Sequence, residues 1–161
     1  MTGLYVAFLI ASLLHMTEEY FLPGGFMNAM KEMNPGFAPL VTVPMAVIVN
    51  GLQLALCGLV IVFGDRSAVF AMSVAALLLI NSIVHFAGSV VRRKYLPGLV
   101  TGLLVYFPVA EYALVHLGPT DMQHFGRYAE AFMWGLAYQL VPLAYFLIAA
   151  AVRRRRMGGS E

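Results

Sequence analysis

The chain has 161 residues, of which 61% are hydrophobic and 11% are charged, whereas an ordinary soluble domain carries about 25% charged residues. With a mean hydropathy of +0.81, the composition excludes an ordinary soluble domain and indicates a multi-pass integral membrane protein. We expect one domain over residues 1–161. The basic residues gather at a few places, so no nucleic-acid partner is implied, and a single cysteine excludes an intrachain disulfide.

Five apolar runs are each long enough to cross the membrane as an α-helix, which takes about 20 residues for about 30 Å of hydrocarbon. The first run lacks the Lys and Arg of a signal peptide, so we expect it to be retained. Residues 24–38 are too short and too polar to span, and they are expected to form one or two amphipathic turns on the membrane surface. The predicted spans are residues 2–22, 39–63, 68–91, 97–117 and 128–152, followed by a basic tail at 153–161.

The basic residues predict the orientation of this all-α, five-helix bundle. With the N-terminus outside and the C-terminus in the cytoplasm, most Lys and Arg residues lie on the cytoplasmic side, as the positive-inside rule requires. We expect a bacterial-type inner (plasma) membrane. The cytoplasmic set is Lys31, Arg92, Arg93, Lys94 and residues 153–156, and the outer set is Arg66 and Arg127.

The first run contains the polar sequence His15-Met16-Thr17-Glu18-Glu19 near its cytoplasmic end. Each residue of an α-helix advances about 100°, so Glu18 lies about 60° to one side of His15 and Glu19 about 40° to the other. All three side chains therefore project from one face. An acid at mid-membrane costs about 2.5–3.5 kcal/mol, which a shared proton, a cationic partner or a metal would offset. Alternatively, the acids only mark the helix end and reach headgroup water.

Polar residues on other runs reach similar depths. His15 and His85 each lie about 10 Å inside the cytoplasmic end of their spans, and Asn50 and Asn81 lie about 16 Å inside. Three helices thus place polar side chains in one zone on the cytoplasmic side.

A second, deeper layer lies about 21 Å from the cytoplasmic end and contains Gln53, Glu111 and Gln139. Pro108, one turn before Glu111, is expected to loosen its helix and free a carbonyl. We expect Glu111 to be protonated, to be hydrogen-bonded to an amide or to the backbone near Pro108, and to line the inner end of a substrate cavity. The two layers would form a polar shaft that enters the bundle from the cytoplasm.

These residues resemble a family of membrane proteins named for a His-x-x-Glu-Glu (HXXEE) motif. His15, Glu18 and Glu19 match that motif, and Asn81-Ser82-Ile83-Val84-His85 matches the family's later Asn-x-x-x-His. Asn50 is assigned to the same set. The chain length and multi-span hydropathy are similar as well. The resemblance implies site residues but no reaction, because the family has no settled activity.

Two imidazoles and two carboxylates suit a divalent metal, with zinc favoured over iron or manganese. Two His and one Glu leave an open position, as in hydrolytic zinc sites, and the spare carboxylate, Glu18 or Glu19, would be a general base. The expected ligands are His15, Glu18, Glu19 and His85. Ligand orientation and substrate binding are assigned to Asn50, Asn81, Gln53, Glu111 and Gln139.

The sequence therefore favours a metal-dependent, hydrolase-like intramembrane enzyme that acts on a lipid or isoprenoid-like substrate from the cytoplasmic leaflet. Three other interpretations stay open: a metal-free acid–base isomerase of a lipid-like substrate, a proton- or cation-coupled transporter, and a structural polar network. The spacing Gly98-x-x-x-Gly102 permits close helix contact, more often within one chain than between two, and leaves a homodimer open.

Overall fold

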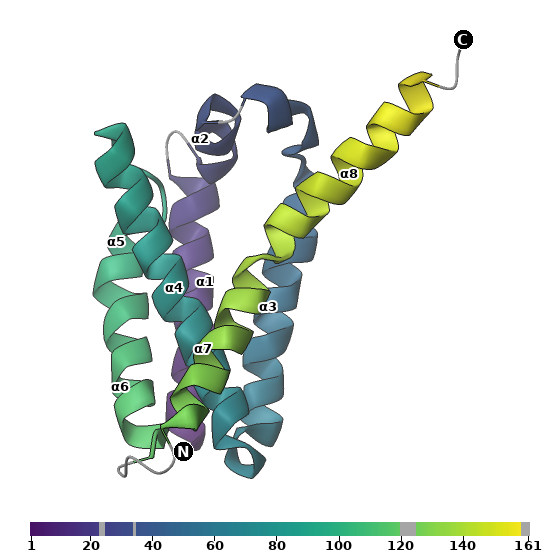
Figure 1. Ribbon diagram of the computed structural model, residues 1–161. Helices are drawn as coiled ribbons and strands as arrows, with labels where there is room; N and C mark the ends of the chain where they lie inside the picture. The colour runs from purple at the N-terminus through teal and green to yellow at the C-terminus, as the bar shows by residue number, and fades with distance from the viewer. Residues whose placement is uncertain (23–24, 34, 120–124, 159–161) are drawn as a thin grey trace.

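The computed structural model describes residues 1–22, 25–33, 35–119 and 125–158, without the side chains of residues 37 and 153–158. Within these ranges the regular elements are all helical (Figure 1). The elements are α1 (Thr2–Phe21), α2 (Phe26–Met33), the 3-10 turns η1 (Pro35–Leu40) and η2 (Gly64–Arg66), α3 (Val43–Phe63), α4 (Ala68–Arg92), α5 (Leu99–Thr101), the π-helical stretch η3 (Gly102–Tyr106), α6 (Phe107–Leu117), α7 (Gly126–Gln139) and α8 (Val141–Gly158). The predicted basic run at 153–156 lies outside the described side chains.

Four helical stretches are long and apolar enough to cross a membrane, which indicates a multi-pass membrane protein. They are Val43–Arg66, Ala68–Arg92, Leu99–Leu117 and Gly126–Val152. α1 has 20 residues but is not one of the four, because His15, Glu18 and Glu19 lower its hydropathy.

α4 is the central helix of the bundle. Of its most apolar stretch 56% is buried, against 28% or less for the other three candidate spans. It packs on α7 on one side and on η3 and α6 on another, while α1 packs against α3 (Figure 1). The main core lies between these helices, with Tyr5, Phe8, Met72, Leu78 and Tyr106 among its largest buried side chains.

Local sequence signals account for the ends of these helices. Thr42 caps α3 by accepting a hydrogen bond from the backbone N–H of Met45, and Ser67 caps α4 by accepting one from Phe70. α1 ends before Leu22, which has an extended backbone with ψ 153°. Pro23 follows in the sequence, and a proline disfavours the helical conformation of the residue before it.

Two predicted spans differ from the structure in their details. The second begins at Val43 rather than at residue 39, because residues 35–40 form the separate turn η1. The fifth is broken at Leu140, since Pro142 has no N–H to donate to the carbonyl of Tyr138. Above the break α8 packs against α3 and η1, and its far end projects away from the bundle (Figure 1). The amphipathic turns predicted for residues 24–38 correspond to α2 and η1.

The predicted loosening of the helix near Pro108 is confirmed. α5, η3 and α6 follow one another without a break, and η3 has π-helical geometry over Gly102–Tyr106. Pro108 lacks the N–H that an α-helix would donate to the carbonyl of Leu104. The backbone hydrogen bonds just before Pro108 therefore take the wider π-helical spacing.

Candidate functional site

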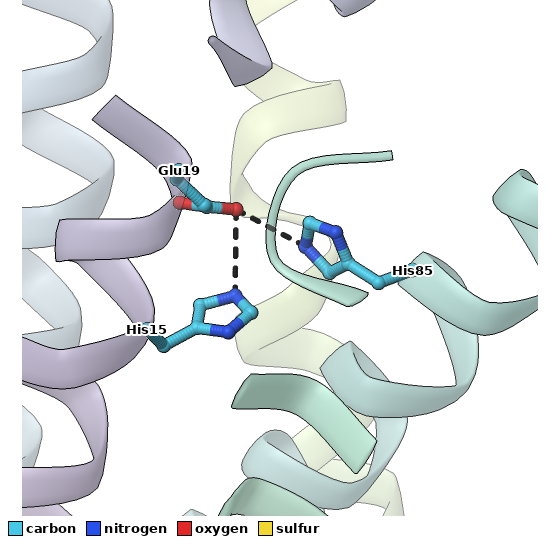
Figure 2. A group of neighbouring side chains, drawn as sticks. All are labelled: His15, Glu19 and His85. Carbon is cyan, nitrogen blue, oxygen red and sulfur yellow. Dashed lines mark ion pairs between the residues drawn. The ribbon is translucent and has the colours of Figure 1, made fainter. Parts of the chain in front are cut away.

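Three buried side chains from two helices meet inside the bundle, toward the C-terminal ends of α1 and α4 (Figure 2). His15 and Glu19 come from adjacent turns of α1, and His85 comes from α4. Glu19 Oε1 lies 3.4 Å from His15 Nε2 and 3.1 Å from His85 Nε2. The exposed fractions of the three residues are only 2%, 5% and 2%. We call these residues the His–Glu–His cluster.

The His–Glu–His cluster has the donor atoms of a metal site. One potential ligand atom from each residue lies within 4.8 Å of the other two. His15 Nε2 and His85 Nδ1 are buried and make no hydrogen bond to any residue that the structure describes, although buried polar atoms are nearly always satisfied. Two imidazoles and one carboxylate are a ligand set of catalytic zinc and of non-haem iron. The residues present therefore fit a divalent metal.

Gly98 packs directly against both imidazoles. Its φ is +97°, in the left-handed region that favours glycine. A Cβ atom there would lie 2.5 Å from Cε1 and 2.6 Å from Nδ1 of His85, and 2.8 Å from Cε1 of His15. From the sequence, Gly98 was predicted only as a helix-contact residue. Its position after Pro97, where the chain enters the fourth span, was the available signal for a special backbone position.

Aromatic rings enclose the imidazoles. Tyr106 stacks on His15, with ring centroids 4.2 Å apart and an interplanar angle of 25°, and Phe26 of α2 lies 5.3 Å from the His85 ring. Tyr106 is fully buried and accepts a hydrogen bond from Gln53 Nε2 at 2.5 Å. Its role was not predicted, because its place beside His15 depends on how α1 and η3 pack.

The His–Glu–His cluster lines a cavity of about 300 Å³ that is bounded by α1, α2, α3, α4, α7 and α8. The cavity also receives four of the predicted amide side chains: Asn50, Gln53, Asn81 and Gln139. Most other lining side chains are apolar, among them Met30, Met45, Leu56, Val84 and Phe146. All the predicted site residues except Glu18 and Glu111 therefore line one cavity.

The amide side chains of the cavity differ in the hydrogen bonds that they make. Asn50 Nδ2 donates to Tyr20 Oη at 2.7 Å and to the carbonyl of Ala46 at 2.8 Å, which connects α3 to α1. Gln53 Nε2 donates to Ser12 Oγ as well as to Tyr106. Asn81 Oδ1, in contrast, is buried and has no hydrogen-bond partner among the described residues. Asn81 Oδ1 is thus a buried acceptor that is available to a ligand in the cavity.

The expectation that Glu18 shares the site with Glu19 needs correction. Glu18 is buried, but its carboxylate is turned toward the start of the fourth span, where it accepts hydrogen bonds from the backbone N–H groups of Val100 and Thr101 and from the hydroxyls of Thr101 and Tyr95. Neighbouring helical residues point about 100° apart, so the two carboxylates reach different partners. Partial burial and the Glu18 carboxylate raise the pKa of Tyr95 above its ordinary value, which keeps this hydroxyl a donor.

The expectation for Glu111 was also wrong in its geometry. Glu111 is exposed on the surface of α6 and does not line the cavity. The buried face of α6 carries Ala110, Ala113 and Leu114 instead. Depth along a span can be counted from the sequence, but the face that a helix turns inward cannot, and Glu111 lies about 100° from Ala110.

Comparison with known proteins gives one match. A family model described as "Protein of unknown function with HXXEE motif" matches residues 6–113. No curated protein and no solved structure matches the chain. The matched segment contains the whole His–Glu–His cluster, Glu18 and Gly98.

Proposed function

The chain belongs to the HXXEE-motif family, whose function is unknown, and we propose that it is a metal-dependent enzyme that acts on a lipid-like substrate within the membrane. A hydrolase-like reaction is favoured. The observation that carries the proposal is the His–Glu–His cluster in the wall of a largely apolar cavity of about 300 Å³. That volume is at the lower end of the range of small-molecule sites, about 300–1,000 Å³.

In this proposal His15, Glu19 and His85 hold a divalent ion, with zinc favoured. When bound, zinc supplies a Lewis acid and lowers the pKa of a coordinated water to about 7. Among the described lining residues Glu19 is the one carboxylate. As a metal ligand it would not be the spare carboxylate, so no described lining residue is assigned the role of general base. Asn81 Oδ1 would accept a hydrogen bond from a hydroxyl or amide of the substrate. The apolar walls would hold an alkyl or isoprenoid-like chain.

The proposal includes five spans, with α1 as the first, the N-terminus outside and the C-terminus in the cytoplasm. An α1 of 20 residues is long enough to cross, and its acids are satisfied inside the bundle rather than by lipid. Phe26 and Met30 of α2 cover the cavity at the end where Lys31 and Arg92 lie. Under the positive-inside rule this end is cytoplasmic. Substrate would enter from that leaflet of a bacterial-type inner membrane.

Metal analysis of the detergent-purified chain tests the proposal. Wild-type protein prepared without chelator should carry one divalent ion per chain. Glu19→Gln keeps the shape of the side chain but removes its charge, so we expect metal affinity to fall by about 100-fold or more, above the range for residues that only support ligands. Glu111→Gln is the matched control, because it makes the same chemical change at an exposed site outside the cavity.

Absence of stoichiometric metal from the wild type, after incubation with zinc, iron or manganese, would contradict the proposal. A metal-free acid–base reaction would then be preferred, since Glu19 between two imidazoles can also exchange protons. Equal loss of metal in Glu19→Gln and Glu111→Gln would likewise contradict it, because the effect would not be specific to the cluster.

A further inference from the structure

Glu18 is the buried acid that the proposed metal site leaves unexplained. Its Oε1 accepts from the backbone N–H of Val100 at 3.0 Å and from the Tyr95 hydroxyl, and its Oε2 accepts from the backbone N–H of Thr101 at 2.6 Å and from Thr101 Oγ1 at 2.5 Å. The first N–H groups of a helix have no acceptor within that helix. Glu18 therefore caps the start of the fourth span from a neighbouring helix.

The same contact connects Glu18 to the His–Glu–His cluster through one hydroxyl. Thr101 Oγ1 lies 2.9 Å from His15 Nδ1. A threonine hydroxyl has a single proton, and Thr101 uses it to donate a hydrogen bond to the carboxylate of Glu18. Toward His15 the hydroxyl can therefore only accept, so His15 Nδ1 must carry a proton.

The proton on Nδ1 determines what the other ring nitrogen can do. In a neutral imidazole with Nδ1 protonated, Nε2 has a free lone pair. His15 Nε2 is buried, faces Glu19 Oε1 at 3.4 Å, and makes no hydrogen bond within the described part of the chain. In metal-binding histidines, the N–H of the ring nitrogen that does not bind the metal commonly donates a hydrogen bond to a carboxylate or another acceptor. This hydrogen bond fixes the ring orientation and the tautomer.

We propose that Glu18 is a positioning residue that acts through Thr101 Oγ1 to hold His15 in its Nδ1–H tautomer, with the lone pair of Nε2 directed at the metal position. The two glutamates of the motif thus have different roles: Glu19 binds, and Glu18 orients. This inference rests on the proposed function for the identity of the bound ligand. The tautomer itself can be measured without any metal.

The test compares three variants of the full-length protein in detergent. Thr101→Val keeps the side-chain shape but removes the hydroxyl, and Thr101→Ser restores the hydroxyl. Thr17→Val is the matched control, because the Thr17 hydroxyl bonds only its own helix, at the carbonyl of Leu13. The readouts are the ring-nitrogen NMR shifts of ¹⁵N-histidine protein, with His15 assigned by a His15→Gln spectrum, and zinc affinity by titration.

We expect His15 to show the Nδ1–H tautomer in metal-free wild type, in Thr101→Ser and in Thr17→Val. Thr101→Val should lose this preference and bind zinc about 10- to 100-fold more weakly, the usual loss for a residue that supports a ligand. An Nε2–H tautomer in the wild type would overturn the inference, whether or not Thr101→Val folds. So would an unchanged tautomer in Thr101→Val. An Nδ1–H tautomer that depends on Thr101, in a protein that binds no zinc, would support the positioning role and reject the proposed metal function.

Discussion

His15 and Glu19 are four residues apart on α1, so their side chains lie one above the other on the same face. His85 approaches from α4, and Glu19 is the residue that both imidazoles contact. Glu18, one position earlier, is satisfied by donors at the start of the fourth span. Two neighbouring residues of α1 therefore point to different places: Glu19 lines the cavity, and Glu18 binds the start of the fourth span.

Gly98 should tolerate no side chain, because it lies against both imidazoles. A Cβ atom at residue 98 would overlap both imidazoles, and a left-handed φ costs a side-chain-bearing residue about 1–3 kcal/mol. Gly98→Ala should therefore weaken zinc binding by about 10-fold or more and lower the thermal unfolding temperature. Gly51→Ala on α3 is the control, because a Cβ there meets nothing within 4 Å. Wild-type zinc affinity in Gly98→Ala would show that the imidazoles do not depend on this contact.

The residues of the cavity could be predicted from the sequence more readily than their roles. Polar side chains at equal depth in apolar spans identified His85, Asn50 and Asn81, because such residues are rarely left facing lipid. The same counting misplaced Glu111, since depth does not determine the inward face. Tyr106 was missed because its contact with His15 depends on the widened turn of η3.

Of the described helices, α4 and α7 make the most extensive contact, and small residues permit it. A Cβ atom added at Gly135 would lie 2.8 Å from the Ala76 side chain and 2.9 Å from the backbone nitrogen of Leu77. Backbone atoms cannot move aside as a flexible side chain can. Gly98-x-x-x-Gly102 works in a similar way within the chain, because Gly102 faces Ser82 of α4.

We therefore expect Gly135→Ala to destabilise the bundle. Overpacking of this kind costs about 1–3 kcal/mol, and the gain in helix propensity, about 1 kcal/mol, offsets only part of it. Thermal unfolding in detergent measures the difference. Gly58→Ala on α3 makes the same change where nothing lies within 4 Å and should not lower the unfolding temperature. A Gly135→Ala protein as stable as Gly58→Ala would mean that α4 and α7 can separate at little cost.

For the whole molecule, hydropathy predicted the helical class and most helix limits, but it could not reveal the breaks. The second span was predicted to begin at residue 39, yet residues 39 and 40 belong to η1, and the fifth run is divided at Leu140. Both departures involve proline, at Pro39 and Pro142. A proline in an apolar run can end, bend or merely loosen a helix, and which of these occurs depends on the packing around it.

The orientation of the molecule in the membrane determines which leaflet would supply the proposed substrate. Arg66 and Lys94 are exposed at opposite ends of α4. With the N-terminus outside, Arg66→Cys should react with a membrane-impermeant maleimide in intact cells, and Lys94→Cys only after permeabilisation. The natural Cys57 is fully buried and should not react, so the wild type is the control. Arg66→Cys removes a positive charge from the proposed outer side, and Lys94→Cys leaves most of the cytoplasmic charges in place, so neither variant should invert the chain. The reverse labelling pattern would put α2 and the adjoining end of the cavity at the outer leaflet, and the proposed substrate would then be sought among outer-leaflet lipids.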